Sequence, residues 1–151
     1  MVELVLMAKI KVKDLMVGEV VTLQAHASVY EAVKLMNKHK IGCLIITRNG
    51  GIVGILTERD LLERVLEKCK NPKETNVFEV MTTHVIIGEP DMEIPKATRI
   101  MFENKVKKLP LVEDRKLVGL VTLTDIARAT SVNEETMALV EKLSNMHIAD
   151  H

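Results

Sequence analysis

Aromatic residues are almost absent from this sequence of 151 residues, which contains one tyrosine, two phenylalanines and no tryptophan. Hydrophobic residues still make up 47% of the chain, so an aliphatic core is expected, with nine methionines as fillers. A bound ring or base would be held mainly between aliphatic side chains and backbone, because stacking platforms are lacking. With 28% charged residues, the composition is that of a globular protein rather than a disordered one.

An excess of charge is also missing, since 21 basic residues balance 21 acidic ones. This balance disfavours a nucleic-acid partner, because duplex binding relies on a basic face. Cys43 and Cys69 are too few for a disulfide scaffold and lack C-x-x-C spacing, which predicts reduced thiols. The apolar start, Met1–Met7, has no basic residues and is too short for a signal peptide or a membrane span. We therefore expect a cytoplasmic protein with no membrane partner.

Patterns typical of catalysis and metal binding are missing as well. The five histidines form no H-x-x-H or H-E-x-x-H motif, and the chain has no G-x-x-x-x-G-K-[ST] loop for a transferable phosphate. No histidine and acid can be assigned to activate Cys43 as a nucleophile. The sequence predicts a protein that is not an enzyme, with no metal site and no obligatory cofactor.

The main feature of the sequence is an internal duplication. Residues 12–65 align with residues 77–130 at a constant offset of 65 and without a gap. Such a duplication indicates one supersecondary unit built twice, and each copy usually needs its neighbour to complete a core. The eleven identical pairs are Val12/Val77, Met16/Met81, Val20/Val85, Ala32/Ala97, Met36/Met101, Lys40/Lys105, Leu44/Leu109, Val53/Val118, Gly54/Gly119, Thr57/Thr122 and Asp60/Asp125.

The duplication predicts the organisation of the whole chain. We expect an N-terminal extension (1–9), a first repeat (10–67), a polar linker (68–76), a second repeat (77–131) and a C-terminal helix and tail (132–151). The helix expected near 133–146 has only a mediocre apolar stripe. It could pack on the repeats, on a second subunit or on a partner.

Each repeat has the pattern β-α-β-β-α. In the first, strands are expected at 20–23, 41–47 and 52–56 and a helix at 60–69. An amphipathic helix is expected between the first two strands, with Val29, Ala32, Val33 and Met36 on its apolar face. Ser28 begins an S-x-x-E capping box, and Asn49-Gly50 is a strong hairpin signal. In the second, strands are expected at 85–87, 109–112 and 117–121, with helices at 95–103 and from Asp125. Pro110 lacks a backbone donor, so its strand should be an edge strand or start there.

The strongest local motif is G-h-h-T-x-x-D, which occurs at Gly54–Asp60 and again at Gly119–Asp125. It falls where the last strand of each repeat meets a helix. One interpretation is a helix cap, with threonine at the N-cap and aspartate three residues later. The other is a ligand site, because helix N-termini attract anions and a carboxylate suits a vicinal diol. Diol plus phosphate describes a ribose nucleotide, but the spacing alone favours the cap.

The arrangement of motifs resembles the cystathionine-β-synthase (CBS) domain. The first copy shows V-x-D-L-M at 12–16, I-G-C-L at 41–44 and G-I-L-T-E-R-D-L-L at 54–62, and the second copy matches in register. Two such domains in tandem resemble a Bateman module, over roughly residues 10–131. The resemblance implies an α/β (α+β) fold with two repeats related by a pseudo-twofold axis and sheets packed face to face. It also implies clefts between the repeats for adenosine-containing ligands: AMP, ADP, ATP or S-adenosylmethionine.

Carried over by motif, the resemblance assigns the ribose hydroxyls to Asp60 and Asp125. The hydroxyl-bearing Thr57 and Thr122 would lie at the ribose or phosphate edge. Arg59, at a helix start where the dipole disfavours a cation, indicates an anionic partner. The full set of expected ligand-binding residues is Thr22, Gly42, Cys43, Thr57, Arg59, Asp60, Ile87, Lys107, Lys108, Thr122 and Asp125.

The remaining members of this set have less specific roles. Backbone groups of Gly42 and Cys43, and of Lys107 and Lys108, would meet the adenine. Thr22 matches a position that often contacts the ligand. Its counterpart Ile87 lacks a hydroxyl, so the second site would bind differently or be vacant.

Three lysines of the second copy, Lys105, Lys107 and Lys108, could meet phosphates or form a solvated rim. The resemblance implies a non-catalytic regulatory module that senses cellular energy state through adenine nucleotides, forms a homodimer and signals to an effector protein. Two alternatives stay open: an interaction module without nucleotide, and a nucleic-acid-associated regulator that acts through these lysines.

Overall fold

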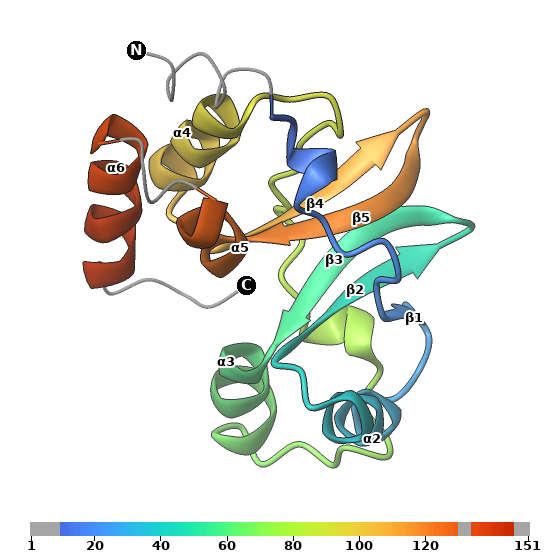
Figure 1. Cartoon of the computed structure of the whole chain (residues 1–151). Helices are drawn as coiled ribbons and strands as arrows, with labels where there is room; N and C mark the ends of the chain where they lie inside the picture. Colours follow the sequence, from blue (N-terminus) through green and yellow to red (C-terminus); the bar gives the residue numbers. More distant parts are fainter. Residues whose placement is uncertain (1–9, 130–133, 147–151) are drawn as a thin grey trace. The chain divides into compact units, whose positions relative to one another are not determined.

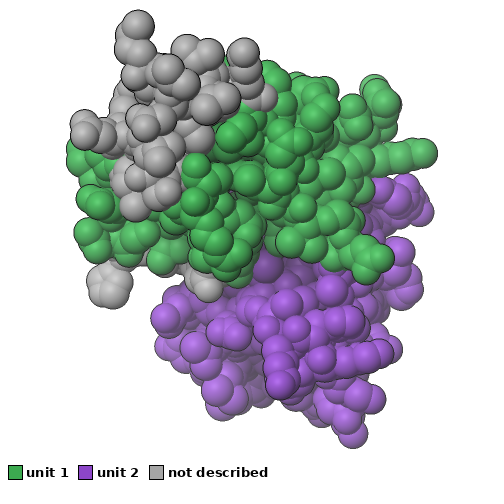
Figure 2. Space-filling model, viewed as in Figure 1, with its two compact units in different colours: residues 1–20, 86–149 green, residues 21–85, 150–151 purple. Residues whose placement is uncertain are grey.

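The computed structural model describes residues 10–129 and 134–146, and Figure 1 shows the order of their helices and strands. The chain divides into two compact units, coloured in Figure 2. Among the described residues, unit 2 comprises 21–85, and unit 1 comprises 10–20 together with those from 86 onward. Both units contain a small sheet and several helices, which confirms the predicted mixed α and β class.

The unit boundaries do not follow the sequence repeats. They fall after Val20 and after Val85, which are equivalent positions of the two copies. Residues 10–20, which begin the first repeat, therefore belong to the unit that contains most of the second repeat. Conversely, residues 77–85 belong to the unit built from the first copy. We call residues 10–20 and 77–85 the leading segments. Each unit thus contains parts of both repeats.

Unit 2 shows the predicted β-α-β-β-α order. Its elements are β1 (Thr22–Gln24), α2 (Val29–His39), β2 (Cys43–Arg48), β3 (Gly51–Thr57), α3 (Glu58–Leu61), the π-helical η2 (Leu62–Leu66) and the 3-10 helix η3 (Val77–Glu79). Strand β2 lies in the centre, parallel to β1 and antiparallel to β3. The predicted hairpin is confirmed, because Asn49 and Gly50 have φ values of 53° and 81°.

The core of unit 2 lies between α2 and the sheet. Helix α2 buries Val29, Ala32 and Met36 along one face. It begins with the predicted capping box, in which the Ser28 hydroxyl accepts the N–H of Glu31 at 3.1 Å. Five consecutive residues of β2 are buried, as expected for a central strand.

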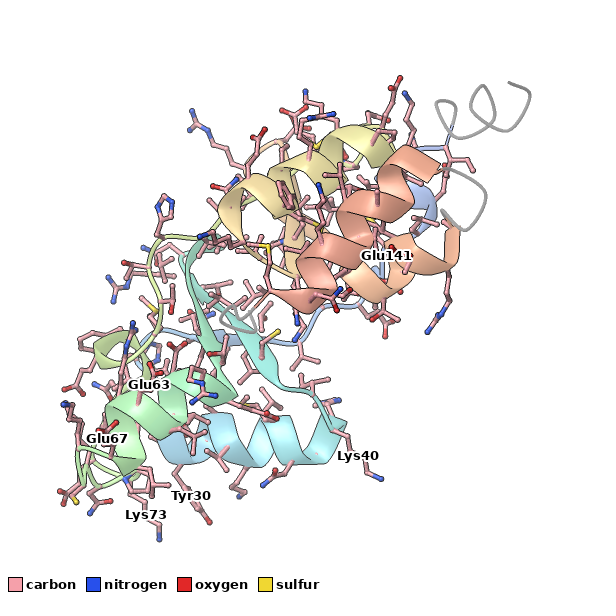
Figure 3. All side chains as sticks on the ribbon, turned by 90° about the vertical axis from the view of Figure 1, so that its left-hand side faces the viewer. Tyr30, Lys40, Glu63, Glu67, Lys73 and Glu141 are labelled. Carbon is pink, nitrogen blue, oxygen red and sulfur yellow. The ribbon has the colours of Figure 1, made fainter. Side chains whose placement is uncertain are left out.

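The linker between the repeats is tied to the start of α2. The first N–H groups of a helix have no partner within the helix. Here the N–H groups of Val29 and Tyr30 donate to the carbonyls of Thr75 and Pro72, at 2.8 and 3.0 Å. The ammonium group of Lys73 lies 5.0 Å from the ring centre of Tyr30, which adds a cation–π contact (Figure 3).

Unit 1 repeats the pattern without its first strand and adds a helix. Its elements are the 3-10 helix η1 (Val12–Asp14), α4 (Ile94–Asn104), β4 (Lys108–Glu113), β5 (Lys116–Thr122), α5 (Leu123–Ala129) and α6 (Glu134–Asn145). Helix α6 packs on α4 and α5 and places Val140 and Leu143 in the core of the unit. Of the three positions that the sequence left open for this helix, the structure therefore shows packing on the repeats.

The strand predicted at 85–87 does not form. Only Gly88 makes a parallel bridge, to Leu111, so β4 and β5 form a two-stranded sheet. In unit 2 the N–H of Ile45 donates to Val21 at 3.5 Å, next to β1. The equivalent of Ile45 is Pro110, which has no N–H to donate. Pro90 likewise lacks the N–H that its equivalent, Ala25, donates to the carbonyl of Thr47 at 2.9 Å. The absence of these two bonds accounts for the missing strand, and β4 lies at an edge, as its proline predicts.

A methionine–glycine contact holds the leading segment in each unit. A Cβ atom built on Gly119 would lie 2.4 Å from the sulfur of Met16, and one on Gly54 would lie 2.4 Å from that of Met81. The adjacent backbone forms the same bridge twice, between Val17 and Leu120 and between Thr82 and Ile55. These contacts explain why both pairs are identical in the two copies: only glycine admits the sulfur.

Among the described residues, no helix combines the length and the apolar character that crossing a membrane requires.

Candidate functional site

The first corner, where β3 runs into α3, is a complete helix cap. The hydroxyl oxygen of Thr57 accepts the N–H of Asp60 at 3.1 Å, and the Asp60 carboxylate accepts the N–H of Thr57 at 3.0 Å through Oδ2. Both side chains are buried. The capping interpretation of T-x-x-D is therefore confirmed at this corner, although a cap does not by itself exclude a ligand.

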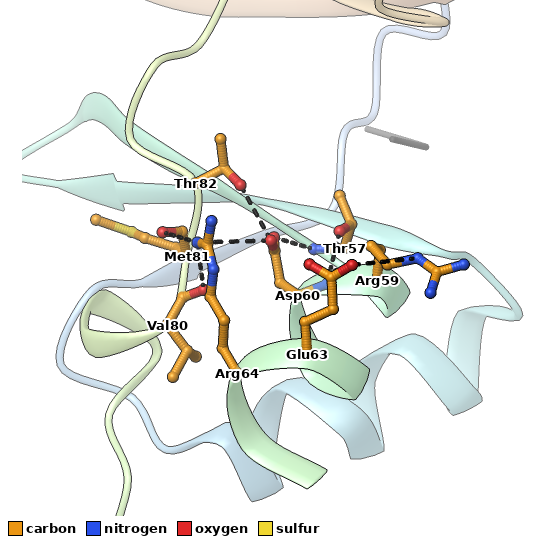
Figure 4. A network of polar contacts seen from close by, with 8 residues as sticks. All are labelled: Thr57, Arg59, Asp60, Glu63, Arg64, Val80, Met81 and Thr82. Carbon is orange, nitrogen blue, oxygen red and sulfur yellow. Dashed lines mark hydrogen bonds and ion pairs between the residues drawn. The ribbon is translucent and has the colours of Figure 1, made fainter. Parts of the chain in front are cut away.

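The second carboxylate oxygen of Asp60 is also engaged. Its Oδ1 accepts the hydroxyl of Thr82 at 3.0 Å and lies 3.6 Å from Nη1 of Arg64 (Figure 4). The same Nη1 donates to the carbonyls of Val80 and Met81, at 3.0 and 2.9 Å. We call Thr57, Asp60, Arg64 and Thr82 the Asp60 network. With 5% of its surface exposed, Asp60 has both oxygens occupied inside this network.

The second corner, where β5 runs into α5, has the same cap. The other contacts of its aspartate differ from those of Asp60. Oδ2 of Asp125 accepts both the N–H and the hydroxyl of Thr122, at 3.0 and 2.8 Å. The N–H of Asp125 donates to the Thr122 hydroxyl oxygen at 3.2 Å. Among the described residues, no donor reaches Oδ1 of Asp125, and the side chain is half-buried rather than buried.

Two substitutions between the copies explain this difference. The equivalent of Thr82 is Val17, which has no hydroxyl, and the equivalent of Arg64 is Ala129, which has no cation. The backbone is not the cause, because Val17 and Thr82 make the same bridge to the neighbouring strand, with N···O distances between 2.8 and 3.0 Å. As far as the described residues show, Oδ1 of Asp125 lacks a partner because these two side chains differ, and not because the backbone differs.

Asp125 borders a cavity within unit 1. The cavity has a volume of about 270 Å³ and is lined by Leu15, Asp125, Arg128 and Ala129. Arg128 is exposed and forms no ion pair with any described residue, Asp125 included. A carboxylate that accepts hydroxyl groups and a guanidinium that binds anions thus line one space. The volume lies just below the ~300–1,000 Å³ of typical ligand pockets, so it suits part of a nucleotide.

The backbone residues expected at the adenine lie beside their own corners. The carbonyl of Gly42 accepts the N–H of Glu58 at 3.1 Å, and the carbonyl of Lys107 accepts that of Leu123 at 2.8 Å. Each carbonyl thereby supports the first turn of the helix and keeps a second lone pair. Cys43 and Lys108 follow directly and pair with the threonines of the corners.

The other expected residues lie in less specific surroundings. Arg59 is exposed, and its Nε lies 3.9 Å from Oε1 of Glu63 in a surface ion pair. Thr22 opens β1 and is exposed, and Ile87 lies outside any strand with 48% exposure. The sequence interpretation missed Arg64, Thr82 and Arg128. Each of them differs from its counterpart in the other copy, but so do most aligned positions, so the difference alone did not single them out.

The chain belongs to the CBS domain family, because the model of this family matches residues 12–67 and again residues 77–132. The resemblance stated from the sequence is thereby confirmed. The CBS domain-containing protein YhcV of Bacillus subtilis is 32% identical over 137 residues, which cover 91% of this chain and 97% of YhcV.

Two further comparisons concern a solved structure and an enzyme. The crystal structure of the CBS domain protein TA0289 from Thermoplasma acidophilum, described as of unknown function, matches 94% of this chain and 80% of that chain. Its TM-score is 0.77 at 25% identity. Inosine-5′-monophosphate dehydrogenase of Methanocaldococcus jannaschii is 32% identical over 120 residues, which cover 78% of this chain but 23% of the enzyme. The similarity therefore concerns a minor part of that enzyme.

Proposed function

We propose that this chain is a non-catalytic regulatory module that binds an adenosine-containing ligand (AMP, ADP, ATP or S-adenosylmethionine) and transmits the bound state to a partner protein. The observation that carries the proposal is the carboxylate of Asp125. Its Oδ1 receives no hydrogen bond from a described residue, and Asp125 lines a cavity that Arg128 also lines.

The chemistry of this cavity fits a ribose with an attached anion. A carboxylate oxygen has two lone pairs, so Oδ1 of Asp125 can accept both hydroxyls of a vicinal diol. Arg128 offers a planar fork of donors to a phosphate. In S-adenosylmethionine the carboxylate of the amino acid would take the place of the phosphate. The backbone of Lys107 and Lys108, beside the same corner, would meet the adenine.

Regulation requires the ligand to distinguish two states of the protein. A ligand shifts an equilibrium only by the difference in its affinity for the two states. In this proposal, the ligand binds more tightly to the conformation in which the second corner is ordered, and the effector protein recognises that conformation. A homodimer is part of the proposal, as the family resemblance implies.

A second candidate function is a CBS pair that mediates protein interaction without a nucleotide. The observation that favours it is the cap at both corners, because Thr57 and Asp60 satisfy each other and Thr122 and Asp125 do the same. In that case the T-x-x-D motifs stabilise helices and bind nothing.

Thermal unfolding separates the two functions. A ligand at about 100 times its Kd adds about 2.7 kcal/mol to the free energy of unfolding. For a chain of this size, that corresponds to a rise in Tm of about 5–10 °C. We expect such a rise with at least one of AMP, ADP, ATP and S-adenosylmethionine at millimolar concentration. Inorganic phosphate and 2′-deoxy-AMP are the controls, because each lacks part of the diol and phosphate pair. If none of the four ligands moves Tm, the nucleotide function is wrong and the interaction module is left.

A further inference from the structure

We infer that the two corners of this chain have separate roles: the second corner binds the ligand, and the Asp60 network keeps the first corner closed. The inference rests on the proposed function and adds a stoichiometry of one ligand per chain. It also assigns to Thr82 and Arg64 the role of residues that decide which corner is open.

The aspartates of the two corners differ in the contacts of their Oδ1 atoms. A ribose hydroxyl that approached Oδ1 of Asp60 would compete with the Thr82 hydroxyl at 3.0 Å and with Arg64, whose Nη1 lies 3.6 Å from the same oxygen. Asp60 is also 5% exposed, so little of it faces solvent. At Asp125 no described group needs to be displaced from Oδ1, and the cavity already borders that residue.

The arginines of the two corners also differ in their contacts. At the first corner, both arginines near the acid are committed: Arg64 to the carbonyls of Val80 and Met81, and Arg59 to Glu63 at 3.9 Å. At the second corner, Arg128 lines the cavity and has no ion pair with a described residue. As far as the described residues show, an anionic group would meet a guanidinium without an ion pair at the second corner.

The difference between the two corners lies in their side chains and not in their backbone. Both corners have the same cap, the same backbone bridge and the same methionine–glycine contact at 2.4 Å. Closing the first corner therefore depends on Thr82 and Arg64, whose counterparts are Val17 and Ala129. Exchanging these two pairs should exchange the behaviour of the corners.

The first experiment compares matched acid variants of the full chain by isothermal titration calorimetry. AMP, ADP and ATP are titrated separately into the wild type, Asp125→Asn and Asp60→Asn. We expect one site per chain in the wild type. Because a hydrogen bond to a charged group is lost, Asp125→Asn should weaken binding by about tenfold or more. Asp60→Asn keeps a side-chain oxygen that can accept the N–H of Thr57 and should change the affinity by less than about threefold.

The outcomes separate the inference from the function on which it rests. If Asp60→Asn abolishes binding and Asp125→Asn does not, or if two sites are seen in the wild type, the inference is wrong while nucleotide binding stands. If the wild type binds none of the three nucleotides, and S-adenosylmethionine does not raise its Tm, the function and the inference fall together.

The second experiment transfers the closing residues from one corner to the other. The double variant Val17→Thr/Ala129→Arg should close the second corner and weaken binding by about tenfold or more, as Asp125→Asn does. The double variant Thr82→Val/Arg64→Ala should open the first corner and raise the stoichiometry toward two ligands per chain. Circular dichroism confirms that each variant is folded. Unchanged affinity in the first variant, at wild-type fold content, would overturn the inference.

Discussion

The contact between each leading segment and the sheet of its unit gives a sharp prediction about stability. We consider Gly54→Ala and Gly119→Ala, which place a methyl carbon 2.4 Å from the sulfur of Met81 or Met16. Ordinary contacts between heavy atoms are about 3.5–4.0 Å, so the methionine must move by more than 1 Å. The carbonyl oxygens of Thr82 and Val17, at 3.0 and 3.1 Å, close the other side.

Forcing an extra carbon into a packed site typically costs about 1–3 kcal/mol of stability. The methionine is flexible and can yield, but the carbonyl is part of the bridge that holds the segment. We therefore expect each glycine variant to lose about 2 kcal/mol in the free energy of unfolding, measured by urea denaturation followed by circular dichroism.

A double-mutant cycle tests the cause of this loss. Met81→Ala alone should be destabilising because it removes a partly buried side chain that packs against the core of unit 2, but Gly54→Ala/Met81→Ala should cost less than the sum of the single variants. The coupling energy should be about 1 kcal/mol or more, since the two residues are in direct contact. Single glycine variants that lose less than about 0.5 kcal/mol, the range of ordinary surface changes, would refute the close approach. Additive double variants would refute its assignment to the methionine.

Three further predictions concern single side chains. Arg115 has a φ of 66° in the second hairpin, so Arg115→Gly should raise the free energy of unfolding by about 1 kcal/mol, measured in urea. Asp60→Ala should destabilise the chain by about 1–3 kcal/mol more than Asp125→Ala, because both lose a cap but only the first leaves Thr82 and Arg64 without their acceptor; equal losses in urea would contradict the Asp60 network. The hydrogen bond from Lys13 at 2.7 Å and the charge of its ammonium group lower the pKa of Asp91, so Lys13→Ala should raise that pKa toward its ordinary value in an NMR titration. Because the pKa of folded Asp91 is lowered, the stabilisation from this ion pair is present above the ordinary pKa and is lost as the pH falls through the lowered one.

Much of the architecture could be predicted because its signals are local. The Ser28 capping box, the Asn49-Gly50 turn and the amphipathic face of α2 each depend on residues a few positions apart, and the structure confirms all three. The strand at 85–87 was wrong for a reason that is only partly local, because Pro90 lies close to it in the sequence and Pro110 does not. Pro110 was recognised as an edge residue, but the missing N–H acts on a segment more than twenty positions away, and alignment with the first copy concealed this effect.

The candidate site shows the same limit. The T-x-x-D motif located both corners, and its two interpretations could not be separated by spacing, because a cap and a diol site use the same threonine and aspartate. What distinguishes the corners lies outside the motif, at Thr82 and Arg64 in one unit and at Val17 and Ala129 in the other. The assignment of Thr82 to the first corner required the structure, because it belongs to the sequence of the second copy.

Each leading segment belongs to the unit that contains most of the other repeat. This exchange determines what cleavage of the chain between the repeats would do. Cleavage in the stretch 68–76 would separate each sheet from the methionine that packs on it, because Met16 would leave with the first half and Met81 with the second. Neither half alone would contain a finished module. Mixed together, the two halves should restore the module by complementation, as fragments do when each carries a piece that the other lacks.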